Sequence, residues 1–315
     1  EYKVQRRGGK GKSAGQTKVD DDIDSLWIAT LHQDLLCFTN MGRVYKLPVR
    51  RIPLSSRAAK GRPANNYLPL QDGELIQEIM PVRDFTEDQY CVFATQHGLV
   101  KKVPLSAFAN VRSSGIIAIT MKPNDQLIGV VLMALDQDVM LFSSAGKAIR
   151  FKASDIRETG RTSQGVIGIR LKSEQQVISL IAVDPAQDLL LATENGYGKR
   201  TRVADFSRIG RGGQGVIAIN ASERNGALVT AVQVADDHDF LLITTNGAII
   251  RMAAQTVSVL GRNTQGVRLI QLTDDRVVGC QVLESIEDTK TGDEGLEGSA
   301  DDVDDGSVDH VAHDE

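Results

Sequence analysis

The sequence predicts an all-β fold of six propeller-type blades, and three observations carry this prediction. A hairpin pattern occurs five times, a loop pattern ending in glycine occurs six times, and the loop glycines recur about every 50 residues. No stretch keeps an apolar period of 3.6 residues over the roughly 10–12 residues that a helix needs. We therefore expect the 315 residues to hold one array of similar units.

The hairpin pattern consists of an apolar run, a polar turn with glycine, and a second run that ends in a basic residue. Its turn glycines are Gly42, Gly98, Gly146, Gly196 and Gly247. Glycine accepts the positive φ that tight hairpin turns require. The five copies predict hairpins over residues 36–46, 92–102, 140–150, 190–200 and 241–251.

The loop pattern, Arg-x-x-x-Gly, lies between the hairpins and precedes a further apolar run. Its glycines are Gly11, Gly61, Gly115, Gly165, Gly215 and Gly266, and one copy is altered because Val111 replaces the arginine and Arg112 follows one residue late. Each unit of about 50 residues thus predicts about four short strands, which is the content of a propeller blade. The first unit has no hairpin before it, and we expect the strand at 277–283 to help close the array.

Charge is divided unevenly along the chain. The net charge is −5, but residues 284–315 hold 13 acidic side chains and one lysine, whereas the other 283 residues hold 35 basic and 28 acidic ones. We therefore expect a basic domain over residues 1–284 and an acidic, disordered tail over residues 285–315. A basic domain is typical of proteins that bind polyanions.

Several functions are disfavoured by the motifs. Gly210-x-Gly212-x-x-Gly215 precedes an apolar strand where a dinucleotide site needs a helix, and Gly11-Lys12-Ser13 lacks the first glycine of a phosphate loop. The five histidines show no spacing typical of a metal site, and the apolar runs are far shorter than the ~20 residues of a membrane helix. Cys37, Cys91 and Cys280 predict reduced, buried thiols and a cytoplasmic setting. The chain starts without methionine or a signal region, so we expect a piece of a longer protein.

Positive charge recurs at a fixed place in the repeat. The fourth residue after each hairpin glycine is basic in all five copies: Lys46, Lys102, Arg150, Arg200 and Arg251. Strand alternation puts each on one face of its blade, so we expect a ring of charge. The alternative is a set of solvated strand ends that discourage aggregation. The densest basic cluster is at the start, where Arg6, Arg7 and Lys10 alternate with glycines that let the backbone approach a phosphodiester.

These residues carry a resemblance to a known family. The run Gln5-Arg6-Arg7-Gly8-Gly9-Lys10-Gly11 resembles the seven-residue box of the C-terminal domain of the DNA gyrase A protein, and the repeats extend the resemblance over about residues 1–285. The resemblance implies a six-bladed β-pinwheel that wraps DNA around its rim, with the box fixing the chirality of the wrap. It also implies a bacterial type IIA topoisomerase whose catalytic residues, ATP and Mg lie outside this domain, so we expect no enzyme activity and no cofactor here.

The expected partners are duplex DNA, bound largely without regard to sequence, the gyrase B protein, and the N-terminal core of the gyrase A protein. We expect a monomeric domain in the cytoplasm at the nucleoid, without membrane contact. The candidate DNA-binding residues are Gln5, Arg6, Arg7, Gly8, Gly9, Lys10, Gly11, Lys12, Lys46, Arg57, Lys101, Lys102, Arg150, Lys152, Arg161, Lys199, Arg200, Arg211, Arg251 and Arg262.

Three alternatives remain open. The domain can belong to topoisomerase IV, whose C-terminal domain should bind DNA without strong chiral wrapping. It can also be a propeller-like module whose basic ring binds an acidic protein. The tail is either a solvated extension or a polyanion that competes with DNA for the basic domain.

Overall fold

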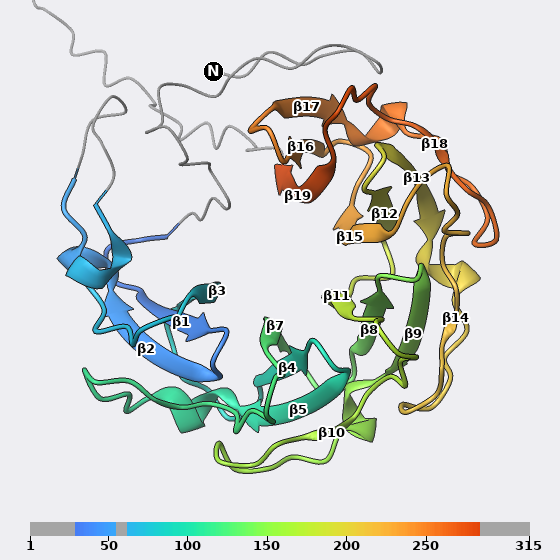
Figure 1. Cartoon of the computed structure of the whole chain (residues 1–315). Coiled ribbons are helices and arrows are strands. Elements are labelled where there is room, and N and C mark those ends of the chain that lie inside the picture. Colours follow the sequence, from blue (N-terminus) through green and yellow to red (C-terminus); the bar gives the residue numbers. More distant parts are fainter. Residues whose placement is uncertain (1–28, 55–61, 284–315) are drawn as a thin grey trace, which may run out of the picture. The chain divides into compact units, whose positions relative to one another are not determined.

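The computed structural model describes residues 29–54 and 62–283, and the statements that follow concern these residues. The chain divides into two units after Ser285, so all described residues lie in the first unit. Its regular structure is β-strands joined by short 3-10 helices (Figure 1). The prediction of an all-β fold is therefore confirmed.

Five β-hairpins form the centres of five sheets, which we number blades 1 to 5. The hairpins are β1 (Asp34–Thr39) with β2 (Arg43–Pro48), β4 (Tyr90–Thr95) with β5 (Leu99–Pro104), β8 (Asp138–Ser143) with β9 (Lys147–Lys152), β12 (Asp188–Thr193) with β13 (Tyr197–Arg202), and β16 (Asp239–Thr244) with β17 (Ile249–Ala253). All five coincide with the predicted hairpins, and the turn glycine of each has a φ between 72° and 86°. The glycine–turn pattern thus places every described hairpin.

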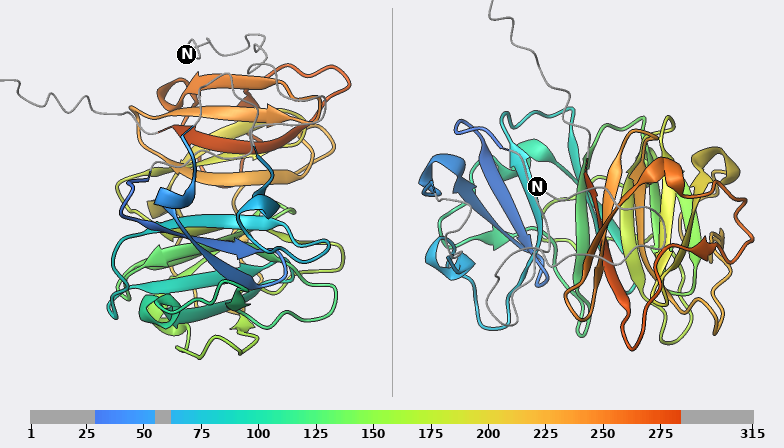
Figure 2. Two further views of the ribbon diagram at one scale, coloured as in Figure 1. Left: turned by 90° about the vertical axis from the view of Figure 1, so that its left-hand side faces the viewer. Right: turned by 90° about the horizontal axis from the view of Figure 1, so that it is seen from above.

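A longer strand pairs with the first strand of each hairpin on the inner side of the blade (Figure 1). These inner strands are β3 (Ile76–Val82), β7 (Leu127–Met133), β11 (Val177–Val183), β15 (Leu228–Val234) and β19 (Val277–Leu283). The strand expected at 277–283 is therefore the inner strand of blade 5. Both views of Figure 2 show successive blades standing side by side.

The fourth strand of a blade comes from the unit that follows it in the sequence. It has only two residues: β6 (Ile116–Ile117), β10 (Val166–Ile167), β14 (Val216–Ile217) and β18 (Val267–Arg268) pair with β2, β5, β9 and β13, respectively. Each of the units of blades 2 to 5 therefore supplies three strands to its own blade and one to the preceding blade. Blade 5 has three strands among the described residues.

The loop glycines explain this exchange. Gly215 has a φ of +71°, and a Cβ there would lie 2.5 Å from the carbonyl oxygen of Ala148 in the preceding blade. A side chain is thus excluded both by the backbone conformation and by the neighbouring strand. The Arg-x-x-x-Gly pattern marks the place where the chain docks against the blade before it.

Hydrophobic clusters lie between successive blades. Phe38 of blade 1 packs edge-on against Phe93 of blade 2 at 5.5 Å between ring centroids, and Phe108 completes that cluster. Equivalent clusters join the later blades. Because the core is divided among the blade interfaces, each interface fixes the position of the loops that cross it.

The described residues form five blades and not the six expected. The count of six depends on the unit around Gly11, which lies outside the described residues, as does the tail predicted over residues 285–315. The 3-10 helices within the described residues are η1 (Val49–Arg51), η2 (Ala64–Asn66), η3 (Leu105–Phe108), η4 (Ala153–Asp155), η5 (Val203–Asp205) and η6 (Ala254–Thr256).

Candidate nucleic-acid interface

The basic residues at the ends of the hairpins connect one blade to the next. We call Lys46, Lys102, Arg150, Arg200 and Arg251 the strut residues. The first four donate hydrogen bonds to backbone carbonyls in or beside the 3-10 helix of the next blade: Lys46 to Ala109 (2.9 Å), Lys102 to Ala153 (3.1 Å), Arg150 to Val203 (3.1 Å) and Arg200 to Ala254 (3.1 Å). The repeated position thus serves the joint between blades.

Four strut residues also form an ion pair with the aspartate twelve residues earlier. The pairs are Lys46–Asp34 (3.6 Å), Arg150–Asp138 (2.7 Å), Arg200–Asp188 (2.7 Å) and Arg251–Asp239 (2.5 Å). In blade 2 the place of the aspartate is taken by Tyr90, and the Lys102 ammonium lies 5.2 Å from the centre of its ring. The aspartates recur in the sequence twelve residues before the basic residues, and this spacing predicts ion pairs. The expectation of a ring of free charge takes no account of these aspartates.

Four of the residues expected to bind DNA are not exposed in the structure. Lys101, Lys102, Lys199 and Arg200 are buried, and burial lowers the pKa of Lys102 below that of an exposed lysine. The physical reason is that alternation fixes the face of a strand on which a side chain lies, but not whether the neighbouring blade covers that face. These four side chains hold the fold together and are not available to an external ligand.

Lys101 and Lys199 fix two of the arginine loops in place. The Lys101 ammonium donates to the carbonyl oxygens of Ala118 (2.8 Å), Arg161 and Ser163 (3.1 Å). The Lys199 ammonium donates to the carbonyls of Gly261 (2.7 Å) and Arg262 (2.6 Å) and to the Thr264 hydroxyl (3.1 Å). Each ammonium therefore has all three of its protons used in hydrogen bonds that hold these loops.

Lys101 and Lys199 are expected to contribute folding stability that grows with pH above about 8. The buried thiols Cys37 and Cys91, whose pKa is raised, act in the opposite direction, so the contribution of the lysines is measured against a variant that lacks them. Burial lowers the pKa of both lysines to about 8, assisted by Arg161 at Lys101 and opposed by Asp205 at Lys199. Above that pH the unfolded chain binds more protons than the folded chain, so raising the pH favours folding; below it both states hold the proton and the contribution is constant. Denaturant unfolding at about pH 7.5 and about pH 9.5 measures the effect. The variant Lys101→Met/Lys199→Met should lack this rise, and an unchanged pH dependence would contradict the assignment.

The accessible candidates lie on the loops and at the strand ends. Among the candidates, Lys152 and Arg211 are exposed, and Arg161 and Arg262 are half-buried. Arg202 is not a candidate, but it lies two residues after Arg200 and is also exposed. Arg211 donates to the carbonyls of Asp155 (2.9 Å) and Ile167 (3.2 Å), and Arg262 donates to the carbonyl of Ile217 (3.2 Å). Arg211 therefore contacts β10, and Arg262 contacts β14. Each of these is the two-residue strand of the preceding unit.

Some candidates cannot be placed, and one was missed. Residues 5–12, which include the whole box, and Arg57 lie outside the described residues. Arg112 was left out of the candidates because it is one residue late in the repeat, yet it is exposed and lines the same hollow as Arg161. In the sequence, Arg112 lies four residues before Ile116, which begins β6, and the other loop arginines lie five residues before the equivalent strands. This near match could have identified Arg112 as a loop arginine.

Three further features concern metal ligands, membrane spans and thiols in the part of the chain that the structure describes. No cluster of three potential metal ligands occurs among these residues, and none of their helices is long and apolar enough to cross a bilayer. Cys37 and Cys91 are buried free thiols, as expected, and burial raises the pKa of each to about 12. Cys280 is a free, half-buried thiol. Thiols with so high a pKa are poor nucleophiles.

The chain is similar to known proteins over nearly all its length. The family model "DNA gyrase C-terminal domain, beta-propeller" matches six successive segments, residues 1–26, 33–83, 89–132, 137–184, 187–235 and 238–284. The DNA gyrase A protein of Escherichia coli strain K12 is 44% identical over 97% of this chain, and that of Halalkalibacterium halodurans is 49% identical over 96%. These alignments cover 35% and 36% of those proteins, so the chain spans about a third of the length of these relatives.

Two solved structures have a similar fold. A DNA gyrase A C-terminal domain aligns with a TM-score of 0.77 at 28% identity and covers 90% of this chain and 93% of its own. The C-terminal domain of a DNA topoisomerase IV aligns with a TM-score of 0.75 at 25% identity and covers 81% of this chain and 80% of its own.

Proposed function

The chain belongs to the DNA gyrase C-terminal domain family, and from this premise we propose that it is a non-catalytic module that binds, bends and chirally wraps duplex DNA. In the complete topoisomerase, the wrapped segment would be passed to the strand-passage core, which gives negative supercoiling. The partners are then duplex DNA, the gyrase B protein and the N-terminal core of the gyrase A protein, at the bacterial nucleoid. ATP and Mg would act in those other parts, and this module would need no cofactor.

The observation that carries the proposal is the repetition of one arginine loop from blade to blade. Figure 1 shows β10, β14 and β18 at the periphery of their blades. Arg161, Arg211 and Arg262 lie at equivalent places in the sequence, each in the loop just before one of these two-residue strands. Lys152 and Arg202 add exposed charge at the ends of β9 and β13. Charges that recur at regular steps fit a bent duplex, because each contact neutralises a different phosphate.

The energetics favour many contacts over a single cluster. Bending about 40 base pairs through half a turn costs on the order of 10 kcal/mol, from a persistence length of about 150 base pairs. Contacts spread over several blades can supply that energy, whereas one basic cluster binds DNA without holding the bend. Aromatic residues make up only 4% of the chain, which disfavours base stacking and single-strand binding. Binding should therefore depend little on sequence.

Affinity for a random-sequence duplex is expected to fall steeply as salt rises. Contacts to about six phosphates would weaken binding by about a thousandfold between roughly 50 and 200 mM salt, because counterions are released on binding. A gel shift or fluorescence titration over that range measures the slope of log affinity against log salt. A flat slope would overturn the proposal and favour the alternative, a module that binds an acidic protein.

A topoisomerase IV-type domain is the second candidate, supported by the likeness to a topoisomerase IV C-terminal domain. That domain should bind DNA with similar salt dependence but without strong chiral wrapping. Ligation of a nicked circle with the chain bound, followed by gel analysis of linking number, separates the two. A shift in linking number that grows with bound protein supports the gyrase-type module.

We also propose that residues 1–26 supply a sixth unit. The support is that the family model matches this segment as the first of six. The boundary of the basic domain would fall after residue 284, and the acidic residues beyond it would compete with DNA. Truncation after Leu283 should then tighten DNA binding, and unchanged affinity would remove the idea of competition.

A further inference from the structure

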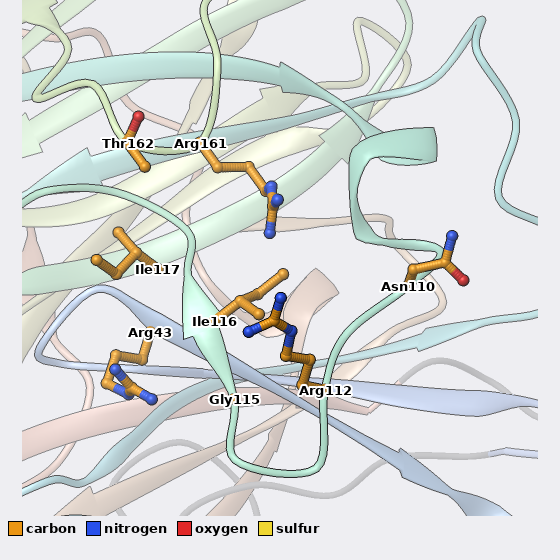
Figure 3. Close-up of a pocket in the computed structure, with 8 residues that line it drawn as sticks. All are labelled: Arg43, Asn110, Arg112, Gly115, Ile116, Ile117, Arg161 and Thr162. Carbon is orange, nitrogen blue, oxygen red and sulfur yellow. The ribbon is translucent and has the colours of Figure 1, made fainter.

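A hollow of about 610 Å³ lies at the joint between the first two blades and the loop that follows η4. Three arginines line it: Arg43 from β2, Arg112 from the loop after η3, and Arg161 from the loop after η4 (Figure 3). Ile116 and Ile117 of β6 form an apolar part of its wall, and Ile117 is 44% exposed.

Arg43 is already occupied by the protein. Its guanidinium donates to the carbonyl of Ser114 (2.7 Å) and to the Tyr45 hydroxyl (3.3 Å), and lies 3.8 Å from the carboxylate of Glu74. This arginine therefore holds the wall of the hollow and carries little unpaired charge.

Arg112 and Arg161 have no such partners among the described residues. No carboxylate or carbonyl there accepts a hydrogen bond from either guanidinium, and Figure 3 shows both groups extending into the hollow from different loops. Two like charges that share a hollow repel each other unless an anion lies between them. A phosphate group suits this arrangement, because arginine binds it through paired hydrogen bonds.

The loop that carries Arg161 is held firmly. The buried Lys101 ammonium binds the carbonyls of Arg161 and Ser163, and also that of Ala118 just after β6. Thr120 adds a hydrogen bond from its hydroxyl to the Thr162 carbonyl (2.7 Å) and one from its N–H to the Ser163 carbonyl (3.1 Å). The backbone beneath Arg161 is thus fixed to the segment that follows β6.

The neighbouring blades lack this pair. At the place of Arg112 the next loops have Thr162, Gly212 and Asn263. Their arginines keep their positive charge but donate part of the guanidinium to backbone carbonyls, Arg211 to two and Arg262 to one, so each has fewer free N–H groups to offer a phosphate. The irregular Val111–Arg112 step therefore adds a second unpaired arginine to one joint among the described blades.

We propose that Arg112 and Arg161 together clamp one phosphodiester of bound DNA in this hollow, with Ile117 against the adjoining deoxyribose. The proposal rests on the proposed function and adds a phosphate site at the irregular loop. Because both arginines act on one phosphate, their contributions to affinity are coupled, unlike those of two separate surface charges.

A double-mutant cycle in the full 315-residue chain tests the clamp. Arg112→Ala and Arg161→Ala are each expected to weaken duplex binding about tenfold, the size of a charged hydrogen-bond contact. The double variant should weaken it well short of about a hundredfold, and should lower the salt slope by about 1. Arg276→Ala, an exposed arginine of blade 5 outside the hollow, is the charge-matched control and should combine additively with Arg112→Ala.

The cycle separates the clamp from the proposed function. If the wild type binds duplex with a steep salt slope but Arg112→Ala and Arg161→Ala equal Arg276→Ala and combine additively, the clamp is wrong and the proposed function stands. If the wild type does not bind duplex, both fail. Thermal unfolding should be nearly unchanged in these variants, because neither guanidinium bonds to a described residue.

Arginine Nε signals in NMR spectra identify the ligand directly. A short duplex is expected to shift the signals of Arg112 and Arg161, and inorganic phosphate alone should shift them only at far higher concentration. Shifts by phosphate without shifts by duplex would assign the hollow to a free anion and overturn the clamp. Absence of both shifts would also overturn it.

Discussion

Alanine at Arg6, Arg7 and Lys10 is expected to abolish chiral wrapping of DNA by the chain while leaving salt-dependent binding in place. These residues form the densest basic cluster in the sequence and lie in register with the five later loops. The expectation rests on that register and on the family, because the box lies outside the described residues. Linking number after ligation of a nicked circle measures the wrap.

The physical reason is that wrapping needs contacts at both ends of a bent segment. A box that binds one end of the bent segment would supply about three phosphate contacts there, and DNA released from it would straighten, because the bend costs on the order of 10 kcal/mol in total. The remaining blades still neutralise phosphates, so binding should weaken without disappearing. The linking-number shift should fall to the level of DNA without protein.

A control with the same loss of charge separates the box from general electrostatics. Lys122, Lys172 and Arg276 are exposed residues of later blades, and alanine at all three removes the same number of positive charges. This control should weaken binding at raised salt but keep a linking-number shift. Wrapping that persists in the Arg6, Arg7 and Lys10 variant would show that the box is assigned wrongly.

The sequence predicts the hairpins well because their cause is local. A turn glycine with positive φ and two flanking apolar runs are enough to define each hairpin, and Gly42, Gly98, Gly146, Gly196 and Gly247 all lie in such turns. The exchanged fourth strand could not be predicted in this way. Val216–Ile217 looks in the sequence like the start of its own blade, but Val216 pairs with Ala148 of the preceding blade, where Gly215 approaches the backbone closely.

The candidate site was predicted less well than the fold. Basic residues such as Arg150 were expected on the surface because of their register, but register does not show that Asp138 and the carbonyl of Val203 surround the guanidinium. The aspartate twelve residues earlier was the available sign of an ion pair. Conversely, the repeat register gives no reason to include Arg112, although a break in a structural repeat is where a specific contact can be added.

Arg200→Leu is expected to lower the free energy of unfolding by about 3 kcal/mol, the effect of breaking a buried ion pair on one side. Arg200 is only 5% exposed, and its guanidinium binds Asp188, the exposed Asp236 and the carbonyl of Ala254 in the next blade. Leucine leaves all three acceptors without this partner at the joint between blades 4 and 5. Denaturant unfolding followed by circular dichroism measures the loss.

Arg202 provides a matched control on the same strand. It lies two residues after Arg200 on β13, it is exposed, and none of the described residues pairs with its side chain. Arg202→Leu should change the unfolding free energy by no more than about 0.5 kcal/mol, as for an ordinary surface position. It should instead weaken duplex binding, while Arg200→Leu should affect binding only as far as it unfolds the chain.

The substitution Arg200→Lys tests in a second way whether residue 200 connects blade 4 to blade 5. Blades 1 and 2 have Lys46 and Lys102 at the equivalent place, and each reaches the next blade's carbonyl with a single ammonium. Arg200→Lys should therefore recover part of the stability that Arg200→Leu loses, although lysine lacks the two-pronged geometry of arginine. If Arg200→Leu were as stable as the wild type and instead lost DNA affinity as Arg202→Leu does, the strut assignment would be wrong and the exposed ring of charge would have to be reconsidered.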